Sequence, residues 1–199
     1  MDYVELSTIN VKGKCNELYE IIIDNYQYEL VIFVAKGSYI IGKKMSDLQN
    51  VPLLEICAMR KAGRIKKVLK PLFRIIPKKI LIMLRKREMN SSYHDKNENR
   101  QVSFNEEKYK KYKNIKKILL VDDSIDSGNS IIETRKVLNK YFDNAEIKVA
   151  VFNVMDKSAI IPDYYLYKNT MINGPWSSDS KENKSYIKEY EKWKENYEK

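Results

Sequence analysis

The sequence has few residues of the types that build metal sites or disulfide frameworks. It contains two cysteines, Cys15 and Cys57, and one histidine, His94, in 199 residues. The cysteines are far apart and form no CxxC pair, which argues against a zinc site or a disulfide scaffold and fits a reducing compartment. No run of 18 apolar residues occurs, so we expect no membrane-spanning helix. The first ten residues lack a basic start followed by an apolar core, so we expect no signal peptide and a cytoplasmic protein.

Acidic residues are absent from one long stretch of the chain. Arg60–Arg87 contains twelve Lys or Arg and no Asp or Glu, which accounts for the whole formal net charge of +10. Such a stretch implies an anionic partner. Because its basic residues interleave with apolar ones, residues 61–88 are typical of an element that lies at a membrane surface, here the inner face. Two alternatives stay open: an extra helical layer against the core or a dimer partner, and a nucleic-acid surface, which the lack of interleaved Tyr or Trp disfavours.

Short apolar runs alternate with amphipathic segments along the rest of the chain. This alternation predicts one α/β domain over residues 1–199, with a mostly parallel twisted sheet flanked by helices. The polar segment Asn90–Gln101 is predicted to be a loop. Strands are predicted at Leu30–Ala35, Val51–Cys57, Ile115–Val121, Glu146–Val154 and Tyr164–Tyr167. Helices are predicted at Asn16–Tyr26, Tyr39–Leu48, Ile131–Tyr141 and from Lys181 to the end.

The sharpest motif is Ile118–Ser130, ILLVDDSIDSGNS, in which an apolar strand leads into two acids, a small polar loop and a helix. In a parallel α/β sheet this places the loop at the carboxyl end of a strand, where ligands bind. The segment Ser127–Ser130 would offer hydroxyls and backbone N–H groups at a helix N-terminus, which suits a phosphate. Asp122 and Asp123 suit a sugar diol, with or without a bridging Mg²⁺. The alternative is an ordinary strand–turn–helix with an Asp cap.

This motif resembles the PRPP-binding signature of the type I phosphoribosyltransferases, with Ser127 and Ser130 in place of two threonines. The resemblance implies that Asp122 and Asp123 hold the ribose hydroxyls and Mg²⁺. It also implies that Asp126 is the base near the acceptor nitrogen. The residues that it assigns to PRPP are Lys36, Gly37, Asp122, Asp123, Asp126, Ser127, Gly128, Asn129 and Ser130.

Three further segments resemble the family in the same order. Val34–Gly37 resembles the loop that presents N–H groups to the pyrophosphate leaving group, although a Lys-Gly after a strand is also found in ordinary turns. Ser91–Asp95 resembles the lid of the 6-oxopurine branch, in particular of xanthine-guanine phosphoribosyltransferase. The resemblance gives a lid over residues 90–104, in which Ser92 and Tyr93 close over PRPP and exclude water. His94 in this lid is expected to be a solvated loop residue.

The part that resembles the acceptor site departs from the family. Pro175-Trp176 resembles the end of the hood over the base, residues 160–180. The lysine that reads the 6-oxo group in this family has no counterpart in the strand Val149–Met155, and Met171 aligns with the aromatic that stacks on the base. The residues implied for the acceptor are Lys157, Met171, Ile172 and Trp176, with packing inside the hood as the alternative for Trp176. Residues 61–88 are an insertion relative to the family.

The resemblance implies a cytoplasmic, Mg²⁺-dependent homodimer that transfers the 5-phosphoribosyl group from PRPP to a small-molecule acceptor, a 6-oxopurine base in the first instance. One alternative is a phosphoribosyltransferase with a non-purine acceptor at a membrane surface, which the basic insertion and the missing lysine favour. Another is a PRPP-sensing regulator that binds nucleic acid. Asp126 and the lid count against the regulator, because a sensor needs neither.

Overall fold

The computed structural model describes residues 2–60 and 100–198. Most of the basic stretch therefore lies outside the described residues, including the whole of 61–88. The lid residues Ser92, Tyr93 and His94 lie outside them as well. What the sequence predicts for these positions stays a prediction.

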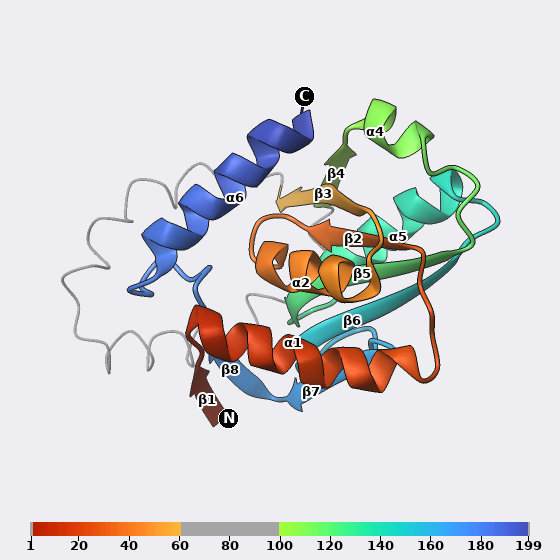
Figure 1. Cartoon of the computed structure of the whole chain (residues 1–199). Helices are drawn as coiled ribbons and strands as arrows, with labels where there is room; N and C mark the ends of the chain where they lie inside the picture. Colours follow the sequence, from red (N-terminus) through yellow and green to blue (C-terminus); the bar gives the residue numbers. More distant parts are fainter. Residues whose placement is uncertain (1, 61–99, 199) are drawn as a thin grey trace.

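A six-stranded sheet forms the centre of the molecule, with strand order β4-β3-β2-β5-β6-β7 (Figure 1). Five of the strands run parallel, and β4 pairs antiparallel with β3 at one edge. The predicted mostly parallel sheet is therefore confirmed. The strands are β2 (Leu30–Val34), β3 (Leu53–Arg60), β4 (Arg100–Phe104), β5 (Lys117–Ile125), β6 (Glu146–Val154) and β7 (Tyr164–Lys168).

Helices cover both faces of this sheet, which explains why the central strand β2 is apolar and buried throughout. Alternate side chains of a strand point to opposite faces. Val31 and Phe33 lie in one core cluster with residues of α1, α2 and α6. Leu30 and Ile32 lie in a second cluster with residues of α4 and α5. The helices are α1 (Thr8–Ile23), α2 (Tyr39–Gln49), α4 (Glu106–Lys110), α5 (Asn129–Tyr141) and α6 (Asn183–Glu198).

A second, two-stranded parallel sheet joins the two ends of the chain. Here β1 (Asp2–Glu5) pairs with β8 (Thr170–Asn173), which follows β7 after the single residue Asn169. The buried amide of Asn153 connects this sheet to the central one: its Oδ1 accepts from the N–H of Thr170 at 2.9 Å, and its Nδ2 donates to Ser124 Oγ at 3.1 Å. The hood predicted from residues 160–180 therefore shares its sheet with the N-terminal strand.

Strands β1 and β8 and helix α4 have no counterpart in the sequence-based prediction, and several other elements differ from it in their bounds or type. Helix α1 begins at Thr8, eight residues earlier than predicted, because Ser7 and Asn10 form a capping box. Strand β5 runs on to Ile125, because its pairing with β6 continues through both acids. Residues 100–104, which were assigned to the lid, form β4, whose first two residues were also expected to be loop. None of the helices in the two described ranges has the length and apolar character needed to cross a membrane.

Candidate functional site

The site lies where the strand order reverses. From β2 the chain passes through α2 to β3 on one side, and from β5 it passes through α5 to β6 on the other side. Because β2 and β5 are neighbours, the loops that follow them, 35–38 and 126–128, leave the same edge of the sheet. Ligands of open parallel sheets bind in the crevice at such a reversal point. The two motifs that resemble the pyrophosphate loop and the PRPP signature thus meet there.

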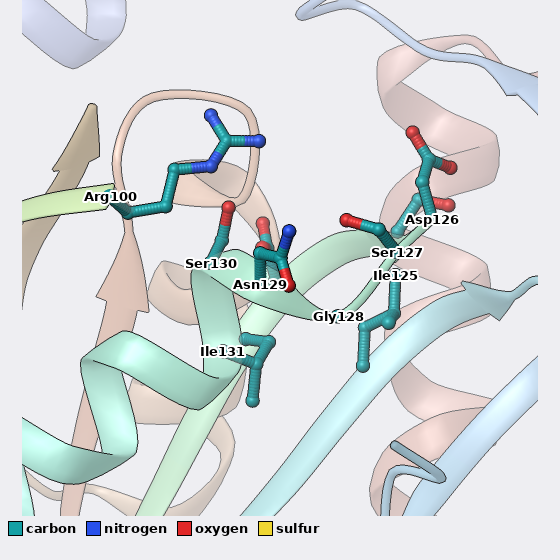
Figure 2. Close-up of a pocket in the computed structure, with 10 residues that line it drawn as sticks. Arg100, Ile125, Asp126, Ser127, Gly128, Asn129, Ser130 and Ile131 are labelled. Atoms are coloured by element: carbon teal, nitrogen blue, oxygen red, sulfur yellow. The ribbon is translucent and has the colours of Figure 1, made fainter. Parts of the chain in front are cut away.

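A polar pocket of about 60 Å³ lies at the end of β5 (Figure 2). This is several times the roughly 10–15 Å³ that one buried water needs, so a phosphate group has room. In Figure 2, Ser127 and Ser130 lie between Asp126 on one side and the guanidinium of Arg100 on the other. The residues that line the pocket are Arg100, Asp122, Ser124, Ile125, Asp126, Ser127, Gly128, Asn129, Ser130 and Ile131.

The backbone at this pocket has the properties of an anion site. Gly128 is the N-cap of α5, has φ of 87° and makes no side-chain capping bond. A side chain there would be strained, and its Cβ would also lie 3.1 Å from Ser158 Oγ. Within the described part of the chain, the N–H groups of Ser127–Ser130 donate no hydrogen bond. Such unsatisfied N–H groups at a helix N-terminus attract a phosphate.

Two adjacent carboxyl groups lie deeper in the same edge of the sheet. Asp122 is 8% exposed, and its Oδ1 accepts a hydrogen bond from the Asp123 N–H at 2.9 Å. Burial, and then the neighbouring carboxylate of Asp123, raise the pKa of Asp122 well above its ordinary value. Burial also raises the pKa of Asp123. A cation or a pair of sugar hydroxyls would stabilise the charged form of this pair.

The turn after β2 packs directly against the second of these acids. A Cβ added to Gly37 would lie 3.0 Å from Asp123 Oδ1, so only a residue without a side chain fits without displacing this carboxylate. The preceding peptide bond, Ala35–Lys36, is cis. The side chain of Lys36, in the same turn, is exposed. The structure thus brings together all nine residues that the resemblance assigns to PRPP: two belong to the turn after β2 and seven to the end of β5 and the start of α5.

Two residues of this site have no role in the sequence-based prediction. Arg100, the first residue of β4, contributes its guanidinium to the pocket. The signal available for it was an arginine shortly after a segment that resembles the lid. Tyr186 of α6 donates its hydroxyl to the carbonyl oxygens of Lys36 and of Gly37, the latter at 3.0 Å. The tyrosines of the C-terminal helix were interpreted as packing, and nothing in their spacing distinguishes this one.

The residues predicted to contact the acceptor are spread over the neighbouring hood. Lys157 is exposed in the turn after β6, next to Ser158, which packs on Gly128. Met171 is buried in the core on β8, and Ile172 is half-buried beside it. Trp176 is half-buried; a Cβ at Gly174 would lie 2.5 Å from its ring, and its centroid is 6.4 Å from those of Phe152 and Tyr186. This agrees with the packing alternative for Trp176.

No protein-family model matches the sequence, and no curated protein matches it. The fold is similar to that of a purine phosphoribosyltransferase from Pyrococcus horikoshii, with a TM-score of 0.60, 21% identity and coverage of 89% of this chain and 95% of the other. The fold is also similar to that of a xanthine-guanine-hypoxanthine phosphoribosyltransferase from Helicobacter pylori, with a TM-score of 0.63, 16% identity and coverage of 92% of this chain and 99% of the other. A hypothetical protein from Neisseria gonorrhoeae with bound ppGpp has a TM-score of 0.62 and 16% identity to this chain, with coverage of 94% of each chain.

These likenesses extend over almost the whole of each compared chain. The low identities mean that they establish the arrangement of the backbone and leave the chemistry to the residues of the site. The chain therefore has the α/β fold of the purine phosphoribosyltransferases.

Proposed function

We propose that this protein is a phosphoribosyltransferase that transfers the 5-phosphoribosyl group from PRPP to the nitrogen of a purine base. One observation carries the proposal. The phosphate-type loop 126–130 and the Lys36-Gly37 turn leave neighbouring strands and flank the Asp122–Asp123 pair, with Gly37 in contact with Asp123. PRPP carries a phosphate, a ribose diol and a pyrophosphate, which these three groups can bind.

The 5-phosphate would occupy the pocket at the start of α5. The N–H groups and hydroxyls of Ser127–Ser130 would donate to its oxygens, and the Arg100 guanidinium would add charge-assisted hydrogen bonds from the facing side. Arg100 thereby becomes a proposed PRPP contact in addition to those that the sequence predicts. Holding this end of the substrate fixes the ribose for displacement at its anomeric carbon.

The buried acids would hold the ribose diol, and their chemistry fits Mg²⁺. No cluster of three or more His, Cys, Asp or Glu suited to a metal occurs among the described residues. Mg²⁺ is commonly bound by one or two carboxylates with the remaining ligands from phosphates and water, so Asp122 and Asp123 suffice in the presence of PRPP. When bound, the ion would supply positive charge against the departing pyrophosphate.

Asp126 is proposed as the general base. It is exposed and lines the pocket, next to the position proposed for the phosphate. In the reaction, the bond between the anomeric carbon and a pyrophosphate oxygen breaks, and a bond from that carbon to the acceptor nitrogen forms. The proton of this nitrogen passes to Asp126. Ser92 and Tyr93 would exclude water as the competing nucleophile.

A purine acceptor is supported by the compared structures. Two of them are named for purine, or for xanthine, guanine and hypoxanthine, and the third contains the guanine nucleotide ppGpp. In this chain the proposed acceptor residues Met171, Ile172 and Trp176 follow β7, the last strand of the central sheet, and the first two belong to β8. The lysine nearest to the end of β6 is Lys157, which is proposed to recognise the 6-oxo group, so 6-oxopurines are the first acceptors to be measured.

The proposal is tested by measuring pyrophosphate release from PRPP and Mg²⁺ with hypoxanthine, guanine or xanthine as acceptor. We expect release with at least one of the three, together with the matching nucleoside monophosphate. Release only with a non-purine acceptor would keep the enzyme class and overturn the purine assignment. Absence of release with every acceptor, in a protein that still binds PRPP by calorimetry, would contradict the enzyme proposal.

A further inference from the structure

The C-terminal helix reaches across the molecule and contacts the turn proposed to bind pyrophosphate. Tyr186, in the first turn of α6, is 4% exposed, and its hydroxyl donates to the carbonyls of Lys36 and Gly37. Burial, and then the nearby Asp123 carboxylate, raise the pKa of Tyr186, so the hydroxyl keeps its proton and remains a donor. The same hydroxyl thus contacts the turn and lies close to the acidic pair.

The direction of these two carbonyls determines the direction of the neighbouring amides. A trans peptide unit is planar, and its C=O and N–H point to opposite sides. With the carbonyls of Lys36 and Gly37 directed at Tyr186, the N–H groups of Gly37 and Ser38 face away from α6. Among the described residues, neither of these N–H groups donates a hydrogen bond to another group. Consecutive free N–H groups on one side of a turn form an anion-binding concavity.

The lysine side chain of the turn is held by the same helix. Lys36 Nζ lies 5.5 Å from the centre of the Tyr190 ring, one helical turn after Tyr186. Tyr190 in turn donates its hydroxyl to the buried carboxylate of Glu55 on β3, which also pairs with Lys194 at 2.6 Å. The helix is therefore anchored to the sheet through the buried Glu55 carboxylate, and it contacts both the backbone and the lysine side chain of the turn.

We propose that α6 is part of the pyrophosphate site, with Tyr186 as the positioning residue that holds the Lys36-Gly37 turn so that its N–H groups face the leaving group. This inference rests on the proposed function for the identity of the anion. It gives the charged C-terminal segment a role that its sequence pattern does not indicate. Tyr186 itself does not contact the substrate, and its effect passes through the turn.

The test compares Tyr186→Phe with Tyr28→Phe. Tyr28 is a matched control, because its buried hydroxyl also donates to a main-chain carbonyl, Met45 O at 2.9 Å, away from the turn. We expect Tyr186→Phe to raise the KM for PRPP and the inhibition constant of inorganic pyrophosphate roughly tenfold, as for the loss of one to two hydrogen bonds. The affinity for the nucleoside monophosphate product, which lacks pyrophosphate, should stay within about twofold of wild type. Tyr28→Phe should change none of these constants by more than about twofold.

The outcomes separate this inference from the proposed function. If Tyr186→Phe weakens pyrophosphate and nucleotide binding equally, or neither of them, the positioning role is wrong. If wild type binds pyrophosphate more tightly than Tyr186→Phe but turns over no acceptor, the role stands and the phosphoribosyltransferase proposal fails.

A measurement on the wild type covers the case in which the variant does not fold. Pyrophosphate should slow amide hydrogen exchange at Gly37 and Ser38 and also in the N-terminal turns of α6. Slowed exchange in the turn alone would contradict a helix that holds it.

Discussion

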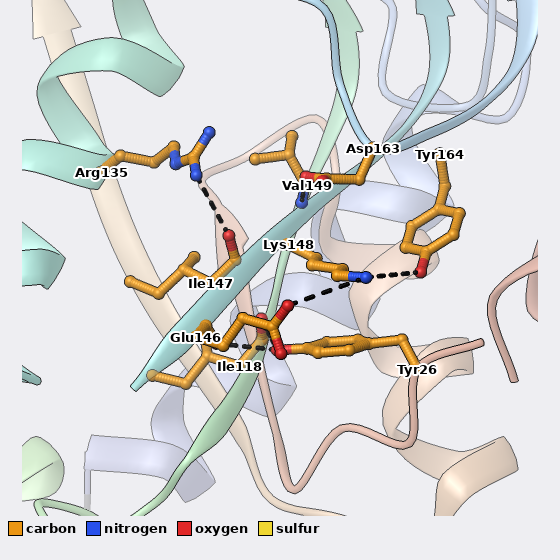
Figure 3. Close-up of polar contacts among 9 residues, drawn as sticks. All are labelled: Tyr26, Ile118, Arg135, Glu146, Ile147, Lys148, Val149, Asp163 and Tyr164. Atoms are coloured by element: carbon orange, nitrogen blue, oxygen red, sulfur yellow. Dashed lines mark hydrogen bonds and ion pairs between the residues drawn. The ribbon is translucent and has the colours of Figure 1, made fainter. Parts of the chain in front are cut away.

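The amino and carboxyl ends of the central sheet differ in whether their polar groups have hydrogen-bond partners. At the amino end, side chains are paired with the backbone and with one another (Figure 3). The Tyr26 hydroxyl donates to Glu146 O at 2.7 Å and lies 3.2 Å from Ile118 O, while Lys148 pairs with the Glu146 carboxylate at 3.7 Å and lies 4.8 Å from the Tyr26 ring centre. At the carboxyl end, by contrast, two acids are adjacent and the N–H groups of Ser127–Ser130 have no partner among the described residues.

This difference indicates that a ligand binds at the carboxyl end of the sheet. Buried polar groups in a folded protein are normally satisfied, and the amino end follows that rule: Asp163 accepts from the Val149 N–H at 2.7 Å, and Arg135 donates to Ile147 O at 3.3 Å. An edge of the same sheet that leaves donors unpaired and like charges together has lower stability than it could have. Proteins accept such a cost at functional sites.

The largest expected effect is on turnover, at the carboxyl end. Asp126→Ala should lower kcat by about 10²–10⁴-fold, the contribution typical of a general base, with little change in the KM for PRPP. Asp143→Ala is the control, since Asp143 is an exposed carboxylate in the turn between α5 and β6. Steady-state rates of pyrophosphate release measure both variants. Full turnover by Asp126→Ala would remove the base assignment.

The second largest effect is expected on substrate binding, in a comparison of two arginine variants. Arg100→Gln should raise the KM for PRPP by about 10- to 100-fold, because a charge-assisted hydrogen bond to phosphate is lost. Arg135→Gln removes an arginine of the amino end, where the guanidinium donates to a carbonyl, and should leave this KM unchanged. Equal KM values for the two variants would show that Arg100 does not bind the phosphate.

A smaller effect concerns stability and its dependence on pH. Burial raises the pKa of Asp122, so the folded protein binds more protons than the unfolded chain above the ordinary value of 3.8. Stability therefore falls as the pH rises through this window and stays lower above it.

Asp122→Asn should consequently stabilise the protein near pH 7 by about 0.5–2 kcal/mol and should not stabilise it below the ordinary carboxyl pKa. Thermal unfolding at a series of pH values measures this. Asp163→Asn, at the amino end, should give no such gain, because this carboxylate already accepts from the backbone. A lower melting temperature for Asp122→Asn at pH 7 would contradict the inference that the buried charge of Asp122 destabilises the folded protein.

The smallest effect is expected at the amino end and on stability alone. Tyr26→Phe removes the hydroxyl that bridges the starts of β5 and β6, which should cost about 0.5–1.5 kcal/mol of unfolding free energy. Denaturant unfolding measures it, with Tyr165→Phe, an exposed tyrosine of β7, as the neutral control. Turnover per folded molecule should match wild type. A change in kcat or in the KM for PRPP would mean that the two ends are coupled.

The strands and the phosphate loop could be predicted from the sequence because their signals are local. Each of the five parallel strands of the central sheet contains a short apolar run, and the motif at residues 118–130 contains its strand, acids and glycine in one segment. Leu30–Val34 and Glu146–Val154 agree with the predicted strands to within one residue. Gly128 could be singled out for the same reason, and it adopts the left-handed conformation that glycine permits.

The missed parts depend on contacts between distant segments. Strand β1 has four residues of mixed polarity and is a strand because β8 lies beside it. Arg100 and Tyr186 enter the site from elements that are far from residue 126 in sequence, and their types occur many times elsewhere in the chain. Only the register of β4 on β3, and the docking of α6, bring these two residues to the site.

The antiparallel pairing of β3 with β4 has a consequence for how this chain can be rebuilt. Residues 60 and 100 are directly opposite each other in the register, so the points at which the chain leaves and rejoins the sheet are adjacent. Closing a loop between such points becomes only slowly more costly with length, by about 0.6 kcal/mol per doubling. The edge of the sheet is thus a graft point, at which residues 61–88 can be exchanged while the sheet and the segment that resembles the lid are kept.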